Sequence, residues 1–299
     1  MPNIPQIVQK KWLWFGISAL MIIPVMIVLA TNGIRVGIDF KSGAVLEYET
    51  TTNVSNDAVV NSLKDVDLKT KTIQLSGNNA FRLKTDALSE TDHDKIKSAI
   101  QSAFKDAKET RYETVGPTIG QDQTKKAIAR VLIASIAIIL YIAWAFRKIP
   151  KPANSWKFGF AAVAALLHDL LFVVGMFALL GQFYDFIEVD SLFITALLTV
   201  MGFSVHDTIV VFDRIRENLR LNPGAPFADA ANISIVQTLA RSLNTSLTVV
   251  LVLLILFLLG GESTKGFTLA LLLGIAVGTY SSIFNATPLL VMWQERSKK

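Results

Sequence analysis

The stretch SLFITALLTVMGFSVHDTIVVF, which runs from Ser191 to Phe212, decides the fold. It is mostly apolar, and at about 1.5 Å per helical residue it can cross the roughly 30 Å hydrocarbon core of a bilayer. Five more stretches of this kind occur at approximately 12–30, 127–146, 158–180, 243–259 and 266–293. Together they predict an α-helical polytopic membrane protein with six transmembrane helices.

The composition agrees with a membrane protein and argues against other classes. Of the 299 residues, 52% are hydrophobic, and the mean hydropathy is +0.45, more than soluble domains carry. A formal net charge of +5 raises nucleic-acid binding as an option, but the excess basic residues lie in short runs beside the apolar stretches, as membrane topology requires. Cysteine is absent, which excludes disulfides and cysteine-based metal sites or nucleophiles. We therefore expect neither a soluble enzyme nor a partner of nucleic acid.

Basic residues gather in the short loops on one side of these stretches. Twelve Lys and Arg residues belong to that set, and the opposite set holds only Lys265. Because basic residues near helix ends resist translocation, both termini are predicted to be cytoplasmic and the long segment 31–126 to be extracytoplasmic. Lys10 and Lys11 precede the first stretch as in a signal peptide, but no A-x-A cleavage site follows it. We expect this stretch to remain as an anchor.

The segment 31–126 alternates strand and helix patterns. Strands are predicted at 45–50, 72–75, 80–83 and 111–115, with a turn at 77–79 between the middle two and helices at 56–66 and after a Thr91 cap. The β-α-β-β-α-β order is typical of a ferredoxin-like α+β domain. Three regions follow from this: 1–30, the cytoplasmic N-terminus and first helix; 31–126, the extracytoplasmic domain; and 127–299, the other five helices and the cytoplasmic C-terminus.

Ionisable residues within the apolar stretches are the candidate functional residues, because charge in a membrane is costly. Asp207 lies 16 residues after Ser191, and Arg241 lies 18 residues before Leu259, so both are roughly 24 to 27 Å below the same membrane face. An ion pair between them is therefore available, and its rearrangement could switch the carboxylate between proton uptake and release. The alternatives are a static structural pair or an Arg241 that snorkels to the interface.

His168-Asp169 repeats the pattern of His206-Asp207. Adjacent helical residues point about 100° apart and are not expected to face each other, and no metal-ligand spacing such as H-E-x-x-H is present, so no metal is expected. Asp169 is either a second proton-relay residue or a hydrogen-bonded structural carboxylate. Polar and small residues that suit helix packing or a polar lining are Thr245, Ser246, Gly274, Gly278 and Ser281.

Several motifs together resemble the SecF branch of the SecD/SecF family of membrane proteins, within the RND superfamily. They are GIDF (37–40), VGP (115–117), HD (168–169), GFSVHDT (202–208), VFDRIREN (211–218), TLARS (238–242), TSLT (245–248) and GTYSSI (278–283). The resemblance covers nearly the whole chain. It implies a six-helix RND-type half in the bacterial inner membrane that works with SecD and the SecYEG translocon on preproteins in transit. It also implies that the proton gradient supplies the energy without a cofactor, with Asp207 as the proton-responsive carboxylate and Arg241 as its partner.

The chain departs from the family pattern at two positions. His206 stands where the family usually has Asn, which places a second titratable group beside Asp207. Ser42 replaces the first Gly of a Gly-Gly pair, so the backbone there is expected to be less strained or differently turned. Two other functions stay open: an RND-like exporter of lipids or small molecules, and a passive scaffold of a translocon. Neither these nor the transport role is enzymatic.

Overall fold

A computed structural model describes residues 5–64, 66, 71–77, 79–147, 149–150 and 154–296 of the chain. The chain divides into two compact units. The first comprises Met1–Arg35, Ala129–Ile187 and Leu192–Lys299, and the second comprises Val36–Ile128 and Glu188–Ser191.

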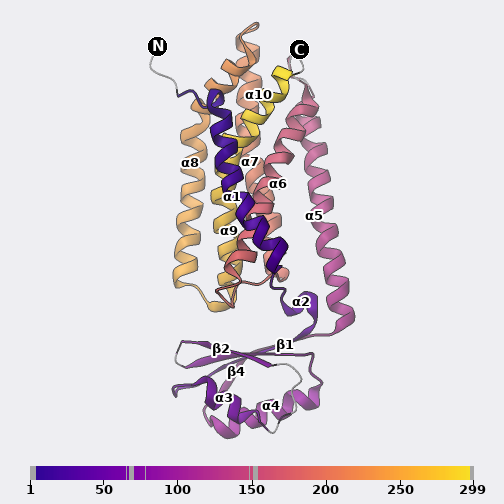
Figure 1. Cartoon of the computed structure of the whole chain (residues 1–299), viewed down its shortest axis with the longest axis vertical. Helices are drawn as coiled ribbons and strands as arrows, with labels where there is room; N and C mark the ends of the chain where they lie inside the picture. The colour runs from indigo at the N-terminus through magenta and orange to yellow at the C-terminus, as the bar shows by residue number, and fades with distance from the viewer. Residues whose placement is uncertain are drawn as a thin grey trace. The chain divides into compact units, whose positions relative to one another are not determined.

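The first unit is a helical bundle, and it confirms the predicted six spans (Figure 1). The first five spans are α1 (Lys11–Asn32, after a short 3-10 turn η1, Val8–Lys10), α5 (Pro117–Ala145), α6 (Ser155–Leu180), α7 (Ser191–Leu221) and α8 (Phe227–Leu259). The sixth combines α9 (Glu262–Ser281), a π-helical turn η2 (Ser282–Ala286) and α10 (Thr287–Arg296). A π-turn inside a helix is rare and frequently marks a functional site.

Helices α7 and α8 extend beyond their apolar stretches. From Phe227 onward the segment 224–240, which precedes the fifth apolar stretch, belongs to one continuous helix with it. The reason is packing: Asn218 Nδ2 of α7 donates a hydrogen bond of 2.7 Å to Ser234 Oγ of α8, and both side chains are buried. A buried polar contact of this kind ties the two extensions together.

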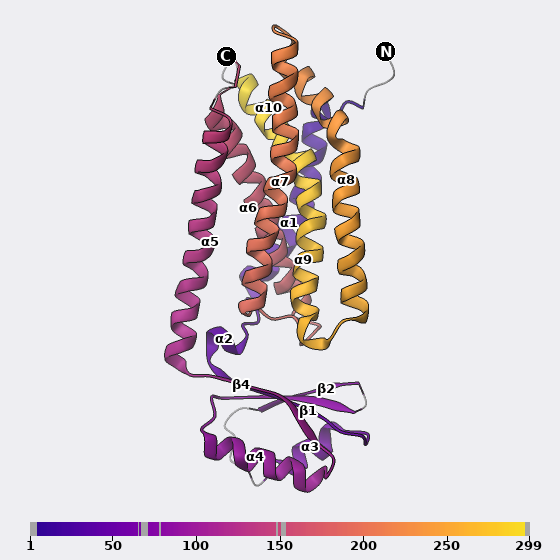
Figure 2. The same ribbon diagram turned by 180° about the vertical axis from the view of Figure 1, so that it is seen from behind.

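Close helix contacts hold the bundle. Helix α1 packs on α6, and α9 lies between α6 and α8, while α5 lies at the edge (Figures 1 and 2). At Gly175 of α6, a Cβ atom would lie 2.6 Å from Cγ2 of Val25 in α1, so the approach of these helices depends on the missing side chain. Phe158 packs edge-on against Phe212, with ring centroids 4.9 Å apart, and joins α6 to α7.

The segment before α1 is fixed by one buried amide. Asn232 of α8 accepts hydrogen bonds at Oδ1 from the backbone N–H groups of Ile7 (2.9 Å) and Val8 (3.2 Å), and its Nδ2 donates to the carbonyl of Pro5 (3.0 Å). Asn232 is 5% exposed. One side chain therefore satisfies three backbone groups ahead of the first helix.

The second unit is a four-stranded antiparallel sheet with two helices on one face (Figure 2). Its elements are β1 (Gly43–Glu49), α3 (Asn56–Ser62), β2 (Lys71–Ser76), β3 (Ala80–Thr85), α4 (Glu90–Ala103) and β4 (Lys108–Val115), after a short helix α2 (Ile38–Lys41). The sheet order β2-β3-β1-β4 confirms the ferredoxin-like arrangement. Leu46, Leu83, Ile96 and Ile100 are fully buried in the layer between sheet and helices.

The cap of α4 differs from expectation. The helix begins at Glu90, and Ser89 is its N-cap, because Ser89 Oγ accepts a hydrogen bond of 3.2 Å from the N–H of Asp92. Thr91 lies inside the first turn. Its hydroxyl is 2.8 Å from that of Ser89 and supports the cap rather than forming it.

The turn into β1 contradicts the expectation for Ser42. Ser42 adopts φ 70° and ψ 158°, a region that is essentially confined to glycine. The backbone at Ser42 is therefore strained, so the expectation of a less strained turn is wrong. The following residue, Gly43, has φ 144°, and a Cβ atom there would lie 2.8 Å from the carbonyl oxygen of Thr85 on β3. The pairing of β1 with β3 therefore leaves no room for a side chain at residue 43.

The GIDF motif contributes backbone and capping contacts in the same unit. The N–H of Gly37 donates to the carbonyl of Val189 at 2.9 Å. Oδ2 of Asp39 accepts from the N–H of Ser191 at 2.8 Å, so a carboxylate caps the first residue of α7, where the helix dipole favours negative charge.

Candidate intramembrane polar site

Two carboxylates lie inside the apolar bundle. Asp169 of α6 is fully buried, and Asp207 of α7 is 7% exposed. Buried carboxylates in a membrane are costly unless they are hydrogen-bonded or protonated. The contacts of each therefore indicate what the site can do.

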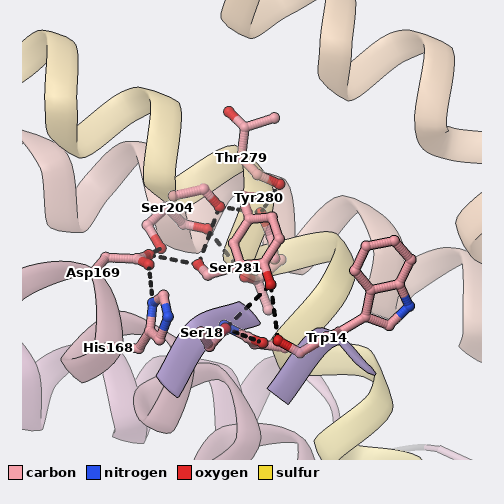
Figure 3. Close-up of polar contacts among 12 residues, drawn as sticks. Trp14, Ser18, His168, Asp169, Ser204, Thr279, Tyr280 and Ser281 are labelled. Carbon is pink, nitrogen blue, oxygen red and sulfur yellow. Dashed lines mark hydrogen bonds and ion pairs between the residues drawn. The ribbon is translucent and has the colours of Figure 1, made fainter. Parts of the chain in front are cut away.

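Asp169 is surrounded by three hydrogen-bonding side chains (Figure 3). Ser204 Oγ of α7 donates to Oδ2 at 2.6 Å, and Ser281 Oγ of α9 donates to the same oxygen at 2.7 Å. Nδ1 of His168 lies 3.0 Å from Oδ1. The carboxylate thus joins α6, α7 and α9.

The contact between His168 and Asp169 corrects an expectation. Neighbouring helical residues were expected not to face each other, and the 100° offset does hold for their Cβ atoms. A long imidazole can fold back along the helix surface, and here it reaches the carboxylate of the next residue. The contact brings two titratable groups of one helix within hydrogen-bond distance.

Asp207 lies at the end of a chain of hydroxyl groups. Ser246 Oγ of α8 donates to Oδ2 of Asp207 at 3.3 Å. The hydroxyl of Thr279 in α9 donates in turn to Ser246 Oγ at 2.6 Å. Hydroxyls can both donate and accept, so such a chain can pass a proton by reorientation.

The two hydrogen-bond networks share helices. Ser204 and Asp207 lie one turn apart on α7, and Thr279 and Ser281 lie two residues apart on α9. Small residues of α9 allow the approach: a Cβ atom on Gly278 would lie 3.2 Å from Cβ of Ser204 and 3.5 Å from Oδ2 of Asp169. Gly274 lies one turn earlier against Val200 of α7. Both glycines of the predicted packing motif therefore face α7.

Arg241 is not paired with Asp207. Among the residues that the structure describes, Asp207 forms no ion pair with it, and the Arg241 side chain is exposed. Counting residues from the membrane face predicts how deep Asp207 and Arg241 lie in the membrane. It does not predict the direction in which each side chain points around its helix axis. Ser242 and Ser246, four residues apart, are buried, so Arg241 and Thr245 fall on the neighbouring face and are exposed. His206 is exposed for the same reason, one residue from buried Asp207.

Arg241 instead lines an open groove of about 550 Å³ between α7 and α8. Its lining also includes Asp213, Arg214, Glu217, Gln237 and Thr238. Arg214 Nε donates to Gln237 Oε1 at 2.6 Å, and Arg214 is paired with Glu217 at 2.5 Å. The groove therefore presents both signs of charge beside Arg241.

Sequence reasoning missed Ser204 and Thr279, which complete the two networks. Their available signal was that both are polar residues close in sequence to residues that were singled out: Ser204 precedes Asp207 by three residues, and Thr279 precedes Ser281 by two. Among the described residues, no group of three or more His, Asp or Glu side chains lies close enough to hold a metal ion. The donor set of this site is one of hydroxyls, carboxylates and one imidazole, which suits protons.

Six apolar spans with buried titratable groups hydrogen-bonded between them define a polytopic membrane protein. The family model for the C-terminal region of the protein export membrane proteins SecD and SecF matches residues 95–296, and the SecD/SecF GG motif matches residues 27–54. The chain therefore belongs to the SecD/SecF family, and it is of the SecF type, a translocase subunit of protein export.

Similar proteins support this assignment. The chain is 41% identical to the protein translocase subunit SecF of Thermobaculum terrenum, over 97% of this chain and 94% of that one. It is 34% identical to the protein translocase subunit SecDF of Bacillus subtilis, but it covers only 38% of that longer protein. The crystal structure of SecDF, a translocon-associated membrane protein from Thermus thermophilus, superimposes with a TM-score of 0.85 at 34% identity, over 99% of this chain and 39% of that one. The likeness to SecF relatives indicates a multi-pass protein of the bacterial inner membrane.

Proposed function

We propose that this chain acts with a SecD partner, uses the proton gradient and assists the movement of preproteins through SecYEG. The observation that carries the proposal is the buried carboxylate of Asp207 at the end of the Thr279 and Ser246 hydroxyl chain. A static structural role would be met more cheaply by an apolar side chain, because an ionised carboxylate in this place needs compensation. A role in proton binding and release, in contrast, requires a titratable side chain at this position.

The chemistry at Asp207 is proton binding and release. When the carboxylate is neutral, it fits the apolar bundle with its bond to Ser246. When it is ionised, the nearest compensating cation on α8 is Arg241, on the adjacent face. A rotation of α8 about its axis brings the guanidinium toward Asp207 and gives the two protonation states different preferred packings. This difference is what couples a proton to movement.

The SecD partnership is supported by two observations. The SecDF of Bacillus subtilis aligns with this chain over only 38% of its length, so a second part accompanies the region that this chain resembles. The exposed polar side chains of His206, Arg241 and Thr245 on α7 and α8 are costly next to lipid. A second helical bundle that covers this face would remove the cost.

The orientation and the outer domain complete the proposal. The bias of basic residues puts both termini in the cytoplasm, and the ferredoxin-like unit then lies outside, where the preprotein emerges. Asp169, with its three hydrogen-bond partners, serves as a second relay residue. The energy source is the gradient itself, without a cofactor.

The test is proton-gradient-dependent preprotein export in vesicles that contain SecYEG, SecD and either wild-type chain or Asp207→Asn. We expect Asp207→Asn to lose the gradient-dependent part of export at least tenfold and to keep the remainder. Asp229→Asn is the matched control, because Asp229 is an exposed carboxylate on α8 away from both networks. Equal gradient dependence in all three proteins, at matched levels and SecD association, would favour a passive scaffold.

A further inference from the structure

A second polar cluster lies between α1, α6 and the π-turn η2, next to His168 (Figure 3). The hydroxyl of Tyr280 donates to the carbonyl of Trp14 at 2.9 Å and lies 3.2 Å from Ser18 Oγ. Ser18 Oγ in turn donates to Oδ1 of Asn285 at 2.9 Å. The ring of Tyr280 is 6.4 Å from the ring of His168, centroid to centroid. The cluster therefore lies next to His168, which is itself in contact with Asp169.

The hydroxyls of this cluster can reorient. Tyr280 and Ser18 carry one proton each, but three contacts compete for these two protons: Tyr280 with Trp14, Tyr280 with Ser18, and Ser18 with Asn285. With the amide oxygen of Asn285 turned toward Ser18, only two of the contacts can be hydrogen bonds at one time. Alternative proton positions of this kind are what a proton-conducting chain of hydroxyls requires.

Two buried polar atoms at this place have no protein partner among the described residues. One is Nε2 of His168, whose Nδ1 is taken by Asp169. The other is Nδ2 of Asn285, a residue that is 6% exposed and lies within η2. If the amide were turned round, its oxygen would take the unpartnered place instead. A buried polar atom without a partner is destabilising, and bound water is the usual remedy, at about three hydrogen bonds per water molecule.

We propose that water binds between α1, α6 and η2, against His168 and Asn285, and that His168 carries protons between this water and Asp169. This inference rests on the proposed proton-driven function and adds a second route that does not pass through Asp207. The water gives a proton to Nε2, and the proton on Nδ1 moves to Oδ1 of Asp169. The water regains a proton from the aqueous phase, and the imidazole is then neutral in its other tautomer. The reverse transfer, from Asp169 back to Nδ1 and from Nε2 back to the water, unloads Asp169 and restores the first tautomer. The titratable groups beside the imidazole are Asp169 on its own helix and Tyr280 on α9, and α1 contributes the Ser18 hydroxyl and the Trp14 carbonyl.

The π-turn explains why the site lies here. A π-turn widens the helix by one residue and loosens its ladder of backbone hydrogen bonds. Ser282 and Asn285, both polar and both buried, occupy this turn. In the sequence they continue the polar stripe of Tyr280 and Ser281, and the structure divides that stripe between two clusters: Ser281 with Asp169, and Tyr280 with Ser18.

The chain contains three histidines, so one imidazole can be observed alone. In a His93→Gln, His206→Gln protein with ¹⁵N-labelled histidine, water-edited solid-state NMR in bilayers reports whether water lies beside the ring nitrogens of His168. We expect rapid transfer of water polarisation to Nε2, slowed at least threefold by Asn285→Leu and by Ser18→Ala. Ser18→Ala removes only one hydroxyl group and disturbs the fold less than Asn285→Leu does. It therefore still tests the site if Asn285→Leu misfolds. A folded protein whose imidazole receives no water polarisation would overturn the site.

Export supplies the second measurement, with all other histidines kept. His168→Phe keeps an aromatic ring but carries no proton, and we expect it to lower gradient-dependent export at least threefold in vesicles with SecD and SecYEG. Water contact together with unchanged export in His168→Phe would overturn the proton route. If Asp207→Asn leaves export unchanged, the proposed function fails at Asp207, whereas the NMR result on His168 still decides the water site.

Discussion

A Cβ atom on Gly274 would lie 2.2 Å from Cγ2 of Val200, so α9 meets α7 here with no side chain of its own between them. We therefore expect Gly274→Ala to lower the free energy of unfolding by about 1–3 kcal/mol, the usual cost of forcing a methyl group into a packed interior. Thermal unfolding in detergent measures this. The double variant Gly274→Ala, Val200→Ala should recover part of the loss, since the clash is with the valine.

Gly278→Ala is the matched comparison on the same helix face. Its Cβ atom would lie 3.2 Å from Cβ of Ser204, which a shift of a few tenths of an ångström can relieve. The loss should be smaller than for Gly274→Ala. The opposite order would show that the helices separate more readily at Val200 than their contact implies.

The Ser42→Gly variant should be more stable than the wild-type protein. At φ 70° and ψ 158° a side chain costs about 1–3 kcal/mol, and the greater freedom of glycine in the unfolded chain takes back part of this. We expect Ser42→Gly to raise the free energy of unfolding of the α+β unit by about 1 kcal/mol. Ser42→Ala, which keeps the Cβ atom, is the control and should give no gain. Pulse proteolysis of the full chain in urea measures both.

Asp106 should contribute acid-sensitive stability. Hydrogen bonds from the hydroxyl and the N–H of Thr51, and from the hydroxyl of Thr50, lower the pKa of Asp106 from 3.8 to about 2. Because the folded state holds the charged form better, this stability is fully present above pH 3.8 and is lost as the pH falls through 2. We expect Asp106→Asn to be less stable than wild type at pH 7.

The difference between Asp106→Asn and wild type should shrink between pH 4 and pH 2. Urea unfolding with an acid protease as the probe measures it over this interval. A difference that does not change with pH would show that the bonds to Thr50 and Thr51 act equally on both protonation states.

Asn232→Leu should release the segment ahead of α1. The substitution keeps the branched shape of the side chain but removes the acceptor of the Ile7 and Val8 N–H groups, at about 1–3 kcal/mol for buried groups left unpaired. We expect faster hydrogen exchange at residues 7 and 8, with the exchange of α9 unchanged. Asn222→Leu, at the exposed end of α7, is the control. Unaltered exchange would mean that Trp14, whose Nε1 donates to the carbonyl of Ile7, holds the segment alone.

Much of the fold could be predicted because hydropathy acts over whole segments. Twenty apolar residues cross a bilayer whatever their neighbours are, so all six spans were predicted, and the ferredoxin-like order followed from alternation and turn residues. The continuation of α8 back to Phe227 was missed because its cause is tertiary: Ser234 is buried against Asn218 of another helix.

The site was predicted less completely. Asp169, Asp207, Ser246 and Ser281 were singled out, and each lies in one of the two hydrogen-bond networks. The direct pairing of Asp207 with Arg241 is absent from the structure, because matching heights along two helices does not determine which way each side chain points. Rotation depends on the packing of every residue on the helix, as the burial of Ser242 beside exposed Arg241 illustrates.

The amide of Asn232 also sets an order of events during synthesis. It lies 225 residues after Ile7, so the ribosome must complete four further spans and begin α8 before the amide exists. Until then the N–H groups of Ile7 and Val8 can bond only to water or to temporary partners. Ile7 and Val8 are thus made long before they can reach their final place, and a nascent chain arrested before residue 232 carries them without this partner.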